Sequence, residues 1–340
     1  MVTQKDIARE AGVSSVTVSN VVNGNYHKVS EENIKKIQGL IEKYHYLPNA
    51  TARSLAKKES QIIGVVIPNI SKDDNFLESP YYARVLGVLE QIVRNKGYYL
   101  MVRCVGKCTE IIPHLSAWNV DGVIFFGAYS EDVAIIKGKT HIPMVFMDTY
   151  VDRKSASCVV ADDHKGGYLA TKYLIERGHR DILFAGPEIK GNGVIPRRYR
   201  GYEKAMKEAG YGRRIRWQYI PITSFDCGME YGGRIASLMP VPTAIFVSAD
   251  ILALGVMAGL RKAGREVPED ISLVGFDNLA EGRYATPTLT TVSQNIVPKA
   301  QLAAKQLFTL IQDKNAEDKE MEVDVEIIER ESVRVIERHI

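Results

Sequence analysis

The sequence has few cysteines, no long apolar run and no signal segment, and each absence excludes a class of protein. Four cysteines occur in 340 residues, at positions 104, 108, 158 and 227, and only the first two form a C-x3-C pair. One such pair predicts no metal site, and the thiols are expected to be reduced. Because no run of eighteen apolar residues occurs, we expect no membrane span. The first residues, MVTQKDIAREAG, lack the apolar stretch of a signal peptide, so we expect a cytoplasmic protein.

The motifs of several enzyme classes are also missing. G-x-S-x-G, G-x-x-x-x-G-K-[ST], G-x-G-x-x-G and H-E-x-x-H do not occur. We therefore expect no enzymatic activity and no bound cofactor. Hydrophobic residues make up 45% of the chain and charged residues 25%, a balance typical of a folded protein with two or three domains.

Positive charge is concentrated at one end of the chain. Residues 1–60 hold nine Lys and Arg against six Asp and Glu, whereas the remainder holds 35 of each kind. The whole formal net charge of +3 therefore lies in the first sixty residues. An excess of positive charge in this segment favours a polyanionic partner for the N-terminal part of the chain.

The first 48 residues show the pattern of three short helices. Thr3 and Asp6 have the spacing of a capping box, and Ser14 and Ser30 stand where the next two helices need an N-cap. Apolar residues recur at helical spacing in each segment: Ile7, Ala8 and Ala11; Val18, Val21 and Val22; Ile34, Ile37, Ile41 and Tyr44.

The second segment, SVTVSNVV, raises a conflict, because β-branched residues in partial alternation are typical of a strand. A helix resolves it, since only a helix places Val18, Val21 and Val22 on one face. Ser15, Val16, Ser19 and Asn20 then face outward, with Thr17 at the edge. Short outward side chains allow close approach to a DNA groove, as in the recognition helix of a helix-turn-helix motif. The alternative is a small helical cap without a ligand.

The stretch TQKDIAREAGVSSVTVSNVVNG resembles the DNA-binding segment of the LacI/GalR family of bacterial transcription regulators. That resemblance implies that Ser15, Val16 and Asn20 meet base edges in the major groove. It also implies that three further residues contact the DNA backbone: Thr3, Ser14 and Thr17. Many members carry Arg at the position of Asn20, and Asn pairs with adenine where Arg pairs with guanine.

The stretch YHYLPNATARSLAKK resembles the hinge of the same family. The family uses this segment as a helix that pairs with its twin in the minor groove, and Leu55 matches the leucine wedged between central base pairs. The resemblance thus implies four DNA-binding residues in the hinge: Asn49, Ala52, Leu55 and Ala56. On composition alone, residues 50–58 could instead be a plain linker, because a helix this short is marginal without a partner.

Beyond residue 60, short apolar runs alternate with amphipathic stretches, as expected for parallel strands in βα units. Examples are IIGVVIPNI, YYLMVRCV, DGVIFFG, IPMVFMD, DILFAGP, TAIFVSAD and ISLVGFDN. Helices are predicted at residues 81–95, 164–177, 198–209 and 251–263, ending near Gly97, Gly178, Gly210 and Gly264. This core is too long for one open sheet, so two α/β subdomains with a crevice between them are predicted.

The segments ERGHRDILFAGP, SADILALGVMAGLRKAG, VPEDISLVGFDN and TPTLTTVSQN match recurrent segments of the same family, whose core is similar to periplasmic sugar-binding proteins. We therefore expect an all-α helix-turn-helix domain in residues 1–48 and a hinge helix with linker in residues 49–60. An effector-binding and dimerisation core should fill residues 61–340. Its N-subdomain is expected at about 61–160 and 293–322, and its C-subdomain at about 161–292 and 323–340.

Polar residues at strand ends and helix starts are candidate ligand contacts in the crevice. Asp148, Asp250 and Asp277 each follow an apolar run, and Arg198 is expected to open a helix. Carboxylates accept from sugar hydroxyls and an Arg fork donates to them. Three aromatic residues could form apolar walls: Tyr81, Tyr82 and Phe225. The alternatives are that each Asp caps a helix or turn, and that the aromatic residues belong to the core.

Together these features predict a dimeric transcription regulator, most simply a repressor, that binds a pseudo-palindromic operator in double-stranded DNA. A small-molecule effector, expected to be a carbohydrate, would close the crevice and alter hinge pairing allosterically. A sugar-binding protein or sugar-acting enzyme with accessory N-terminal helices is the competing interpretation. The missing signal peptide and catalytic motifs argue against it.

Overall fold

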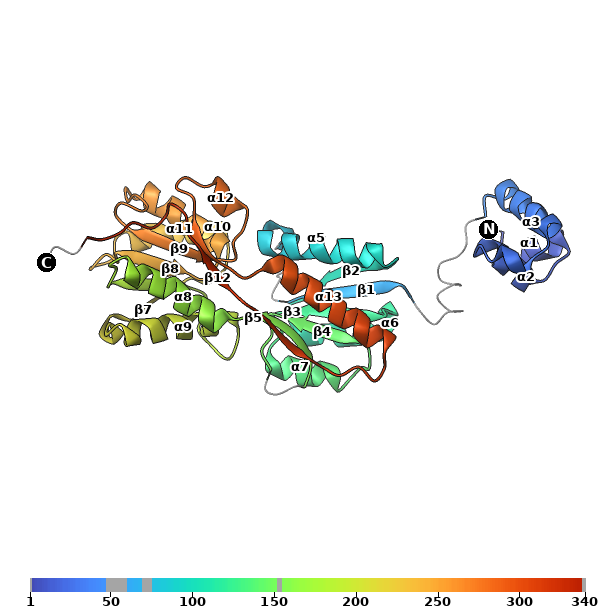
Figure 1. The fold of residues 1–340 in the computed structure, drawn as a ribbon, viewed down its shortest axis with the longest axis horizontal. Coiled ribbons are helices and arrows are strands. Elements are labelled where there is room, and N and C mark those ends of the chain that lie inside the picture. Colours follow the sequence, from blue (N-terminus) through green and yellow to red (C-terminus); the bar gives the residue numbers. More distant parts are fainter. Residues whose placement is uncertain (1, 47–59, 69–74, 152–154, 338–340) are drawn as a thin grey trace. The chain divides into compact units, whose positions relative to one another are not determined.

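The computed structural model describes residues 2–46, 60–68, 75–151 and 155–337 (Figure 1). The chain divides into two compact units, Met1–Gln61 and Ile62–Ile340. Each unit is described separately. No helix within the described ranges is long and apolar enough to cross a membrane.

Within residues 2–46, the N-terminal unit has three α-helices, as the sequence predicted: α1 (Gln4–Ala11), α2 (Ser15–Val22) and α3 (Glu31–Lys43), with a 3-10 turn η1 (Tyr26–Lys28). The predicted capping box is present, because the Thr3 hydroxyl accepts from the Asp6 N–H and the Asp6 carboxylate accepts from the Thr3 N–H. Ser14 caps α2 by accepting from the Thr17 N–H over 3.1 Å. Ser30 precedes α3 in extended conformation but makes no side-chain capping bond.

The three helices enclose one small core, and its buried members are the predicted apolar residues: Ile7, Ala8, Ala11, Val18, Val21 and Ile37. Glu10 joins α1 to the end of α3, accepting from Lys43 Nζ at 2.8 Å and from the Tyr44 hydroxyl at 2.7 Å. These bonds lower the pKa of Glu10. The SVTVSNVV segment is therefore a helix, with Val18 and Val21 packed inward.

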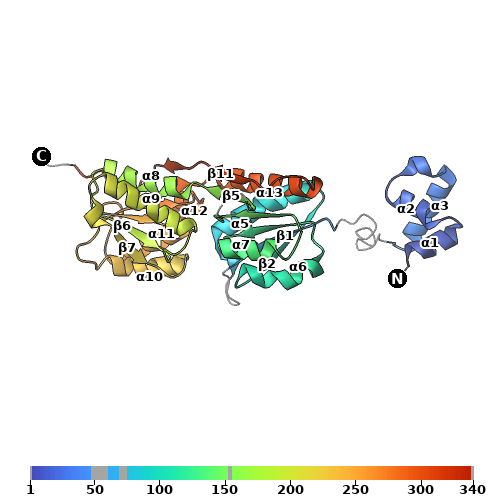
Figure 2. The same ribbon diagram turned by 90° about the horizontal axis from the view of Figure 1, so that it is seen from below.

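The second unit contains two six-stranded sheets, each covered by helices on both faces (Figures 1 and 2). The first sheet is parallel throughout and has the order β11-β5-β4-β3-β1-β2. Its strands are β1 (Ile62–Ile67), β2 (Tyr99–Cys104), β3 (Gly122–Phe126), β4 (Met144–Met147), β5 (Ser157–Ala161) and β11 (Glu320–Val323). Its helices are α5 (Pro80–Asn95), α6 (Ile112–Trp118), α7 (Ser130–Lys137) and α13 (Ile296–Gln312), with η2 (Phe76–Glu78) and η3 (Cys108–Ile111). We call this part the N-subdomain.

The second sheet has the order β12-β10-β9-β8-β6-β7 and is parallel except for the β10 and β12 pair. Its strands are β6 (Ile182–Gly186), β7 (Arg216–Tyr219), β8 (Ala244–Val247), β9 (Ser272–Phe276), β10 (Thr290–Ser293) and β12 (Glu326–Ile328). Its helices are α8 (Asp163–Glu176), α9 (Val194–Glu208), α10 (Phe225–Ile235), α11 (Asp250–Lys262) and α12 (Glu281–Tyr284), with η4 (Gly212–Arg214). We call this part the C-subdomain.

The chain passes between the subdomains three times, after β5, β10 and β11. The order of elements confirms the predicted fold class, an all-α helix-turn-helix unit followed by an α/β core with two parallel-rich sheets. The predicted C-cap glycines Gly97, Gly178, Gly210 and Gly264 all have positive φ, between 77° and 90°. One boundary differs, because α9 begins at Val194, so Arg198 lies in its second turn and does not open it.

Candidate nucleic-acid interface and effector crevice

The outward face of α2 is the candidate DNA-reading surface. Val16 is 69% exposed, Ser15 is exposed, and Asn20 is half-buried, whereas Val18 and Val21 on the opposite face are buried. No acidic residue occurs within α2, so nothing on the helix itself repels phosphate. The side-chain amide of Gln4 donates to the Ser15 carbonyl over 2.8 Å, which ties α1 to the start of α2. This bond fixes the direction from which α2 presents its first turn, and sequence reasoning missed it.

The residues expected on the DNA backbone lie at helix starts. Thr3 and Ser14 are exposed and Thr17 is half-buried, and the hydroxyls of Ser14 and Thr17 lie 2.9 Å apart. Helix N-termini present free N–H groups and a positive dipole end, which suit phosphate oxygens. The hinge residues Asn49, Ala52, Leu55 and Ala56 lie outside the described part of the chain.

On the N-subdomain side of the predicted crevice, Tyr81 and Tyr82 lie in the first turn of α5, and Asp148 directly follows β4. The Tyr81 hydroxyl donates to Asp148 Oδ2, and burial together with the Asp148 charge holds the pKa of Tyr81 well above its usual value. The Tyr82 ring meets Phe126 edge to face, with centroids 5.7 Å apart. Asp148 has a positive φ of 54°, a conformation that ends the strand and turns the chain away from the sheet.

On the C-subdomain side, Arg198 is the central group. Its Nε donates to Asp163 Oδ1 over 2.7 Å, and a second nitrogen donates to the Ser248 carbonyl over 2.5 Å and lies 3.9 Å from Asp277 Oδ1. The guanidinium stacks on the Phe276 ring, 3.6 Å from its centroid. Only 5% of Arg198 is exposed, so each of these contacts acts in a medium that screens charge weakly.

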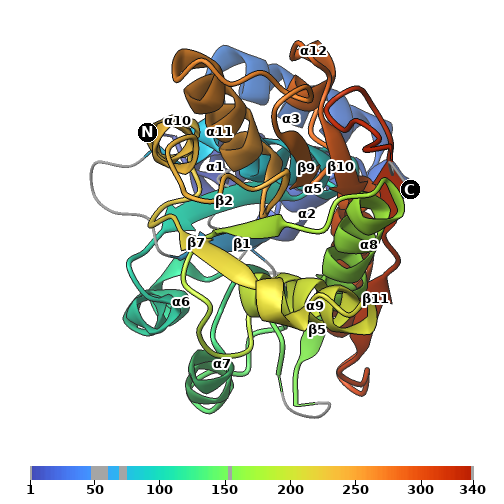
Figure 3. The same ribbon diagram turned by 90° about the vertical axis from the view of Figure 1, so that its left-hand side faces the viewer.

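Glycine allows this placement of Arg198. The α8 and α9 helices lie side by side (Figure 3), and a Cβ at Gly167 of α8 would stand 2.0 Å from the Arg198 carbonyl oxygen. A Cβ at Gly201 would likewise stand 2.1 Å from the His164 carbonyl oxygen. Any side chain at either position would push the helices apart and separate Arg198 from Asp163.

Two residues that the sequence did not single out connect the two sides. Gln294, in the crossing after β10, donates through Nε2 to Asp277 Oδ1. Lys299, in the first turns of α13, donates to the Gln294 side-chain oxygen and to Asp148 Oδ1, the latter over 2.7 Å. A continuous network therefore runs across both subdomains: Tyr81, Asp148, Lys299, Gln294, Asp277, Arg198 and Asp163. Tyr150 extends it by donating to Asp163 Oδ2 over 2.6 Å.

The structure thus brings Tyr81, Asp148, Arg198 and Asp277 into one network, whereas Asp250 and Phe225 form no hydrogen bond with that network in the described part of the chain. Asp250 is fully buried, with its carboxylate accepting from the Leu279 N–H at 2.8 Å and the Thr291 hydroxyl at 2.6 Å. Burial raises the pKa of Asp250 to about 6. Phe225, at the start of α10, is 41% exposed and lines a hollow of about 330 Å³ with Leu254, Met257 and Tyr284 among others.

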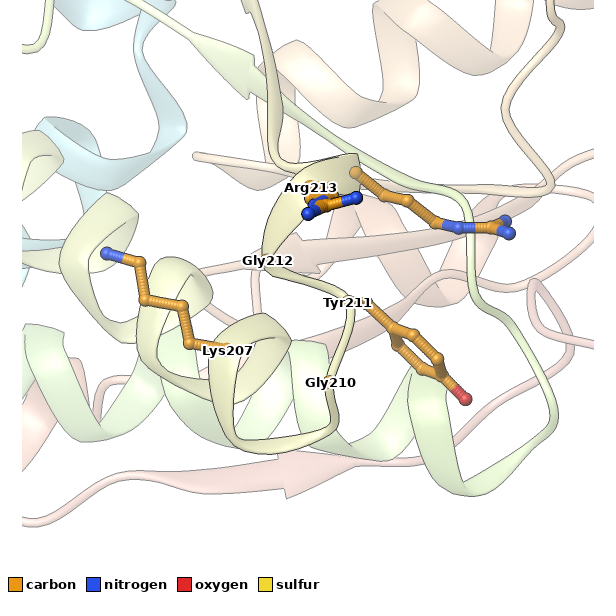
Figure 4. A pocket seen from close by; sticks show the side chains of 6 residues that line it. Lys207, Gly210, Tyr211, Gly212 and Arg213 are labelled. Atoms are coloured by element: carbon orange, nitrogen blue, oxygen red, sulfur yellow. The ribbon is translucent and has the colours of Figure 1, made fainter.

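Another hollow, of about 500 Å³, lies at the end of α9 and contains none of the predicted residues (Figure 4). Its lining is Lys207, Gly210, Tyr211, Gly212, Arg213 and Arg214. Figure 4 shows the side chains of Lys207 and Tyr211 pointing away from each other. Ligand sites place several polar groups so that they point at one ligand. Lys207 and Tyr211 do not, so the internal network is the better candidate for effector binding.

Comparison with known proteins decides the family. Residues 3–49 match the family described as bacterial regulatory proteins, lacI family, and residues 171–333 match the periplasmic binding protein-like domain. The HTH-type transcriptional repressor PurR of Pasteurella multocida is 34% identical over 98% of this chain and 99% of its own length. PurR of Pectobacterium carotovorum is 35% identical over 98% and 97%. The chain belongs to the lacI family of bacterial regulatory proteins.

Solved structures agree with this assignment. A lac repressor dimer bound to operator and the anti-inducer ONPF is similar, with a TM-score of 0.83, 26% identity and coverage of 98% of this chain and 99% of that chain. A LacI family regulator from Enterococcus faecium with bound ribose has a TM-score of 0.70 and 26% identity, over 81% of this chain and 100% of its own. The resemblance inferred from the sequence is confirmed. This LacI-family chain is a DNA-binding transcription regulator that responds to a small-molecule effector. Its PurR relatives are named as transcriptional repressors.

Proposed function

We propose that this LacI-family protein represses transcription by binding a pseudo-palindromic operator as a homodimer, with the outward face of α2 reading each half-site. The observation that carries the proposal is the split of α2 between a face with the buried Val18 and Val21 and a face with the exposed Ser15 and Val16 and the half-buried Asn20. Asn20 would pair with adenine, and the methyl groups of Val16 would meet thymine. Paired hinge segments, with Leu55 wedged between base pairs, would set the spacing of the half-sites.

The double variant Ser15→Ala with Asn20→Ala tests this proposal. Loss of one good base contact costs about 1 to 3 kcal/mol, so we expect operator affinity to fall about 5- to 150-fold for each half-site. Affinity is measured by fluorescence anisotropy at fixed salt, with DNA from upstream of the chain's own gene and a scrambled duplex of equal length. Gln38→Ala, on the exposed side of α3, is the matched control and should bind as the parent does. Unchanged discrimination by the double variant would refute the assignment of α2.

For the dimer, we propose a contact face formed by α10, α11 and α12. Tyr284 is 80% exposed and Phe225 lies beside it in the lining of the 330 Å³ hollow. Exposed apolar groups gathered around a hollow mark interaction surfaces. The dimeric state of the similar lac repressor supports a second copy of the chain as the partner.

For the effector, we propose a carbohydrate held at the internal network between the subdomains. Asp148 and Asp277 offer acceptors, Arg198 offers donors, and Tyr81 offers an aromatic face, which together match a polyhydroxylated ring. The ribose bound to the Enterococcus faecium regulator supports this class of ligand. The network spans both subdomains, so an effector bound there would favour one arrangement of the two subdomains over another. Such a change would alter the spacing of the DNA-binding units in the dimer.

A further inference from the structure

Lys299 is the least expected member of the network. It is fully buried, although lysine is almost never fully buried unless its charge is paired. Its ammonium donates to Asp148 and Gln294 and lies 5.0 Å from the centroid of the Tyr81 ring. A carboxylate, an amide oxygen and an aromatic face therefore surround the charge. Lys299 belongs to α13 of the N-subdomain, whereas Arg198 belongs to α9 of the C-subdomain.

The crevice thus has one buried cation from each subdomain, and each is already matched to carboxylates. Lys299 faces Asp148, while Arg198 contacts Asp163 and lies near Asp277. Three carboxylates face two cations, so the group carries no surplus of positive charge. Burial raises the pKa of Asp277 to about 7, because the desolvated site disfavours a negative charge. A phosphate or carboxylate on a ligand would add such a charge.

A second observation points to a ligand with hydroxyl groups. The Ser248 side chain is fully buried, and its hydroxyl has no hydrogen-bond partner among the described residues. It stands at the carboxyl end of β8, where its carbonyl accepts from Arg198, and it lies close over Gly186, whose Cβ would be 2.4 Å from Ser248 Oγ. A buried hydroxyl without a partner destabilises the folded state. A ligand hydroxyl can both donate to it and accept from it.

We propose that Lys299 determines effector class. By neutralising Asp148 from the N-subdomain, it makes the crevice select an uncharged polyhydroxylated ligand and reject the phosphorylated or carboxylated form of the same ligand. The inference rests on the proposed effector crevice and deepens it. Asp148, oriented by its hydrogen bond from Lys299, accepts from ligand hydroxyls, and the two cations are too well matched to hold an anion.

The first test compares matched ligands on the full chain by isothermal titration calorimetry. The pairs are D-ribose with D-ribose 5-phosphate, D-glucose with D-glucose 6-phosphate, and D-galactose with D-galacturonate. We expect at least one uncharged sugar to bind, with its anionic partner at least tenfold weaker. Tighter binding of the anionic partner, or no binding by any uncharged sugar, overturns the assignment of effector class.

The second test concerns Lys299 itself. Lys299→Met should weaken binding of the uncharged sugar at least tenfold, and the double variant Asp148→Asn with Lys299→Met, which leaves no unpaired buried charge, should weaken it as well. Lys305→Met changes an exposed lysine of the same helix and should bind as the parent does. Asp148→Asn alone leaves Lys299 as a surplus cation. The affinity for the anionic sugar relative to that for its uncharged partner should then rise at least tenfold. A purely structural role of Lys299 would not produce this change.

Parent affinity for the sugar in both Lys299 variants, or an unchanged ratio in Asp148→Asn, overturns the proposal. The double variant covers the case in which Lys299→Met fails to fold, since removing one partner of a buried ion pair is strongly destabilising. Operator binding by the parent protein without sugar is measured separately. Its failure would count against the proposed DNA-binding function, so the two failures are distinguishable.

Discussion

Ionisation of Asp277 should make the core less stable as the pH rises. Asp277 follows β9, and only 6% of it is exposed. Burial raises its pKa from 3.8 to about 7, with the charge of Asp250 acting in the same direction and that of Arg198 opposing it. In the unfolded chain the carboxyl returns to its ordinary pKa near 3.9. Between these two values the folded core holds a proton that the unfolded chain has released.

The sign follows from proton linkage. A carboxyl whose pKa is higher in the folded state stabilises that state fully below about pH 4, and the contribution is lost as the pH rises to about 7. The slope is about 1.4 kcal/mol per pH unit, so about 3 kcal/mol is lost between pH 5 and pH 8. Asp277→Asn cannot ionise, and its side-chain oxygen can still accept from Gln294. Its free energy of unfolding relative to the parent should therefore rise by about 3 kcal/mol over this interval.

Urea unfolding followed by tryptophan fluorescence measures this difference. The two tryptophans, Trp118 and Trp217, both lie in the second unit, so the signal reports the core and not the helix-turn-helix unit. Asp226→Asn, at an exposed position of α10, is the control and should show a difference that does not depend on pH. A parent-to-variant difference for Asp277→Asn that stays constant from pH 5 to pH 8, or falls, would refute the reasoning.

Local patterns predicted the N-terminal unit well because its helices are specified by their own residues. Caps at Thr3 and Ser14 act within one turn, and the periodicity of the valines in α2 overrides their β propensity once α1 and α3 cover them. Buried central strands were equally visible, since both faces of β1, β3 and β9 are covered and the runs are continuously apolar.

The edge strands β7 and β11 were harder to predict for the opposite reason. The strand β7, RWQY, alternates between half-buried and exposed residues, and β11, EMEV, buries one residue. Neither has a continuous apolar run. The start of α9 was misplaced at Arg198 because Pro196 interrupts the apparent pattern, although proline fits the first turn of a helix.

Part of the candidate site was predictable from topology. Asp148 and Asp277 each follow a parallel strand, and carboxyl ends of such strands line the crevice of an α/β fold. Lys299 was missed, although a signal existed. It lies three residues after Ile296 and four before Ala303, and both are buried, so helical periodicity places a lysine on the apolar face of α13. A charge on that face predicts a buried partner, but the partner comes from a distant strand and only the fold identifies it.

Two further variants test the N-terminal unit and the dimer. Ile37→Ala removes a fully buried side chain of α3 at a cost of about 2 to 5 kcal/mol, which a unit this small cannot absorb. Circular dichroism should show loss of helix, and operator binding should vanish. Unfolding of the second unit should be the same as in the parent, and the exposed-site variant Lys36→Ala should behave as the parent does. Retained operator binding by Ile37→Ala would contradict the assignment of this small core. Tyr284→Arg should weaken the dimer about 10- to 30-fold in sedimentation equilibrium, because a buried aromatic residue at an interface contributes about 2 kcal/mol and a charge there must be desolvated. Met239→Arg, at an exposed position on the same subdomain, is the control. Two recognition helices act together only in a dimer, so operator binding by Tyr284→Arg should become strongly dependent on protein concentration. A dimer dissociation constant equal to that of the control would place the interface on another face.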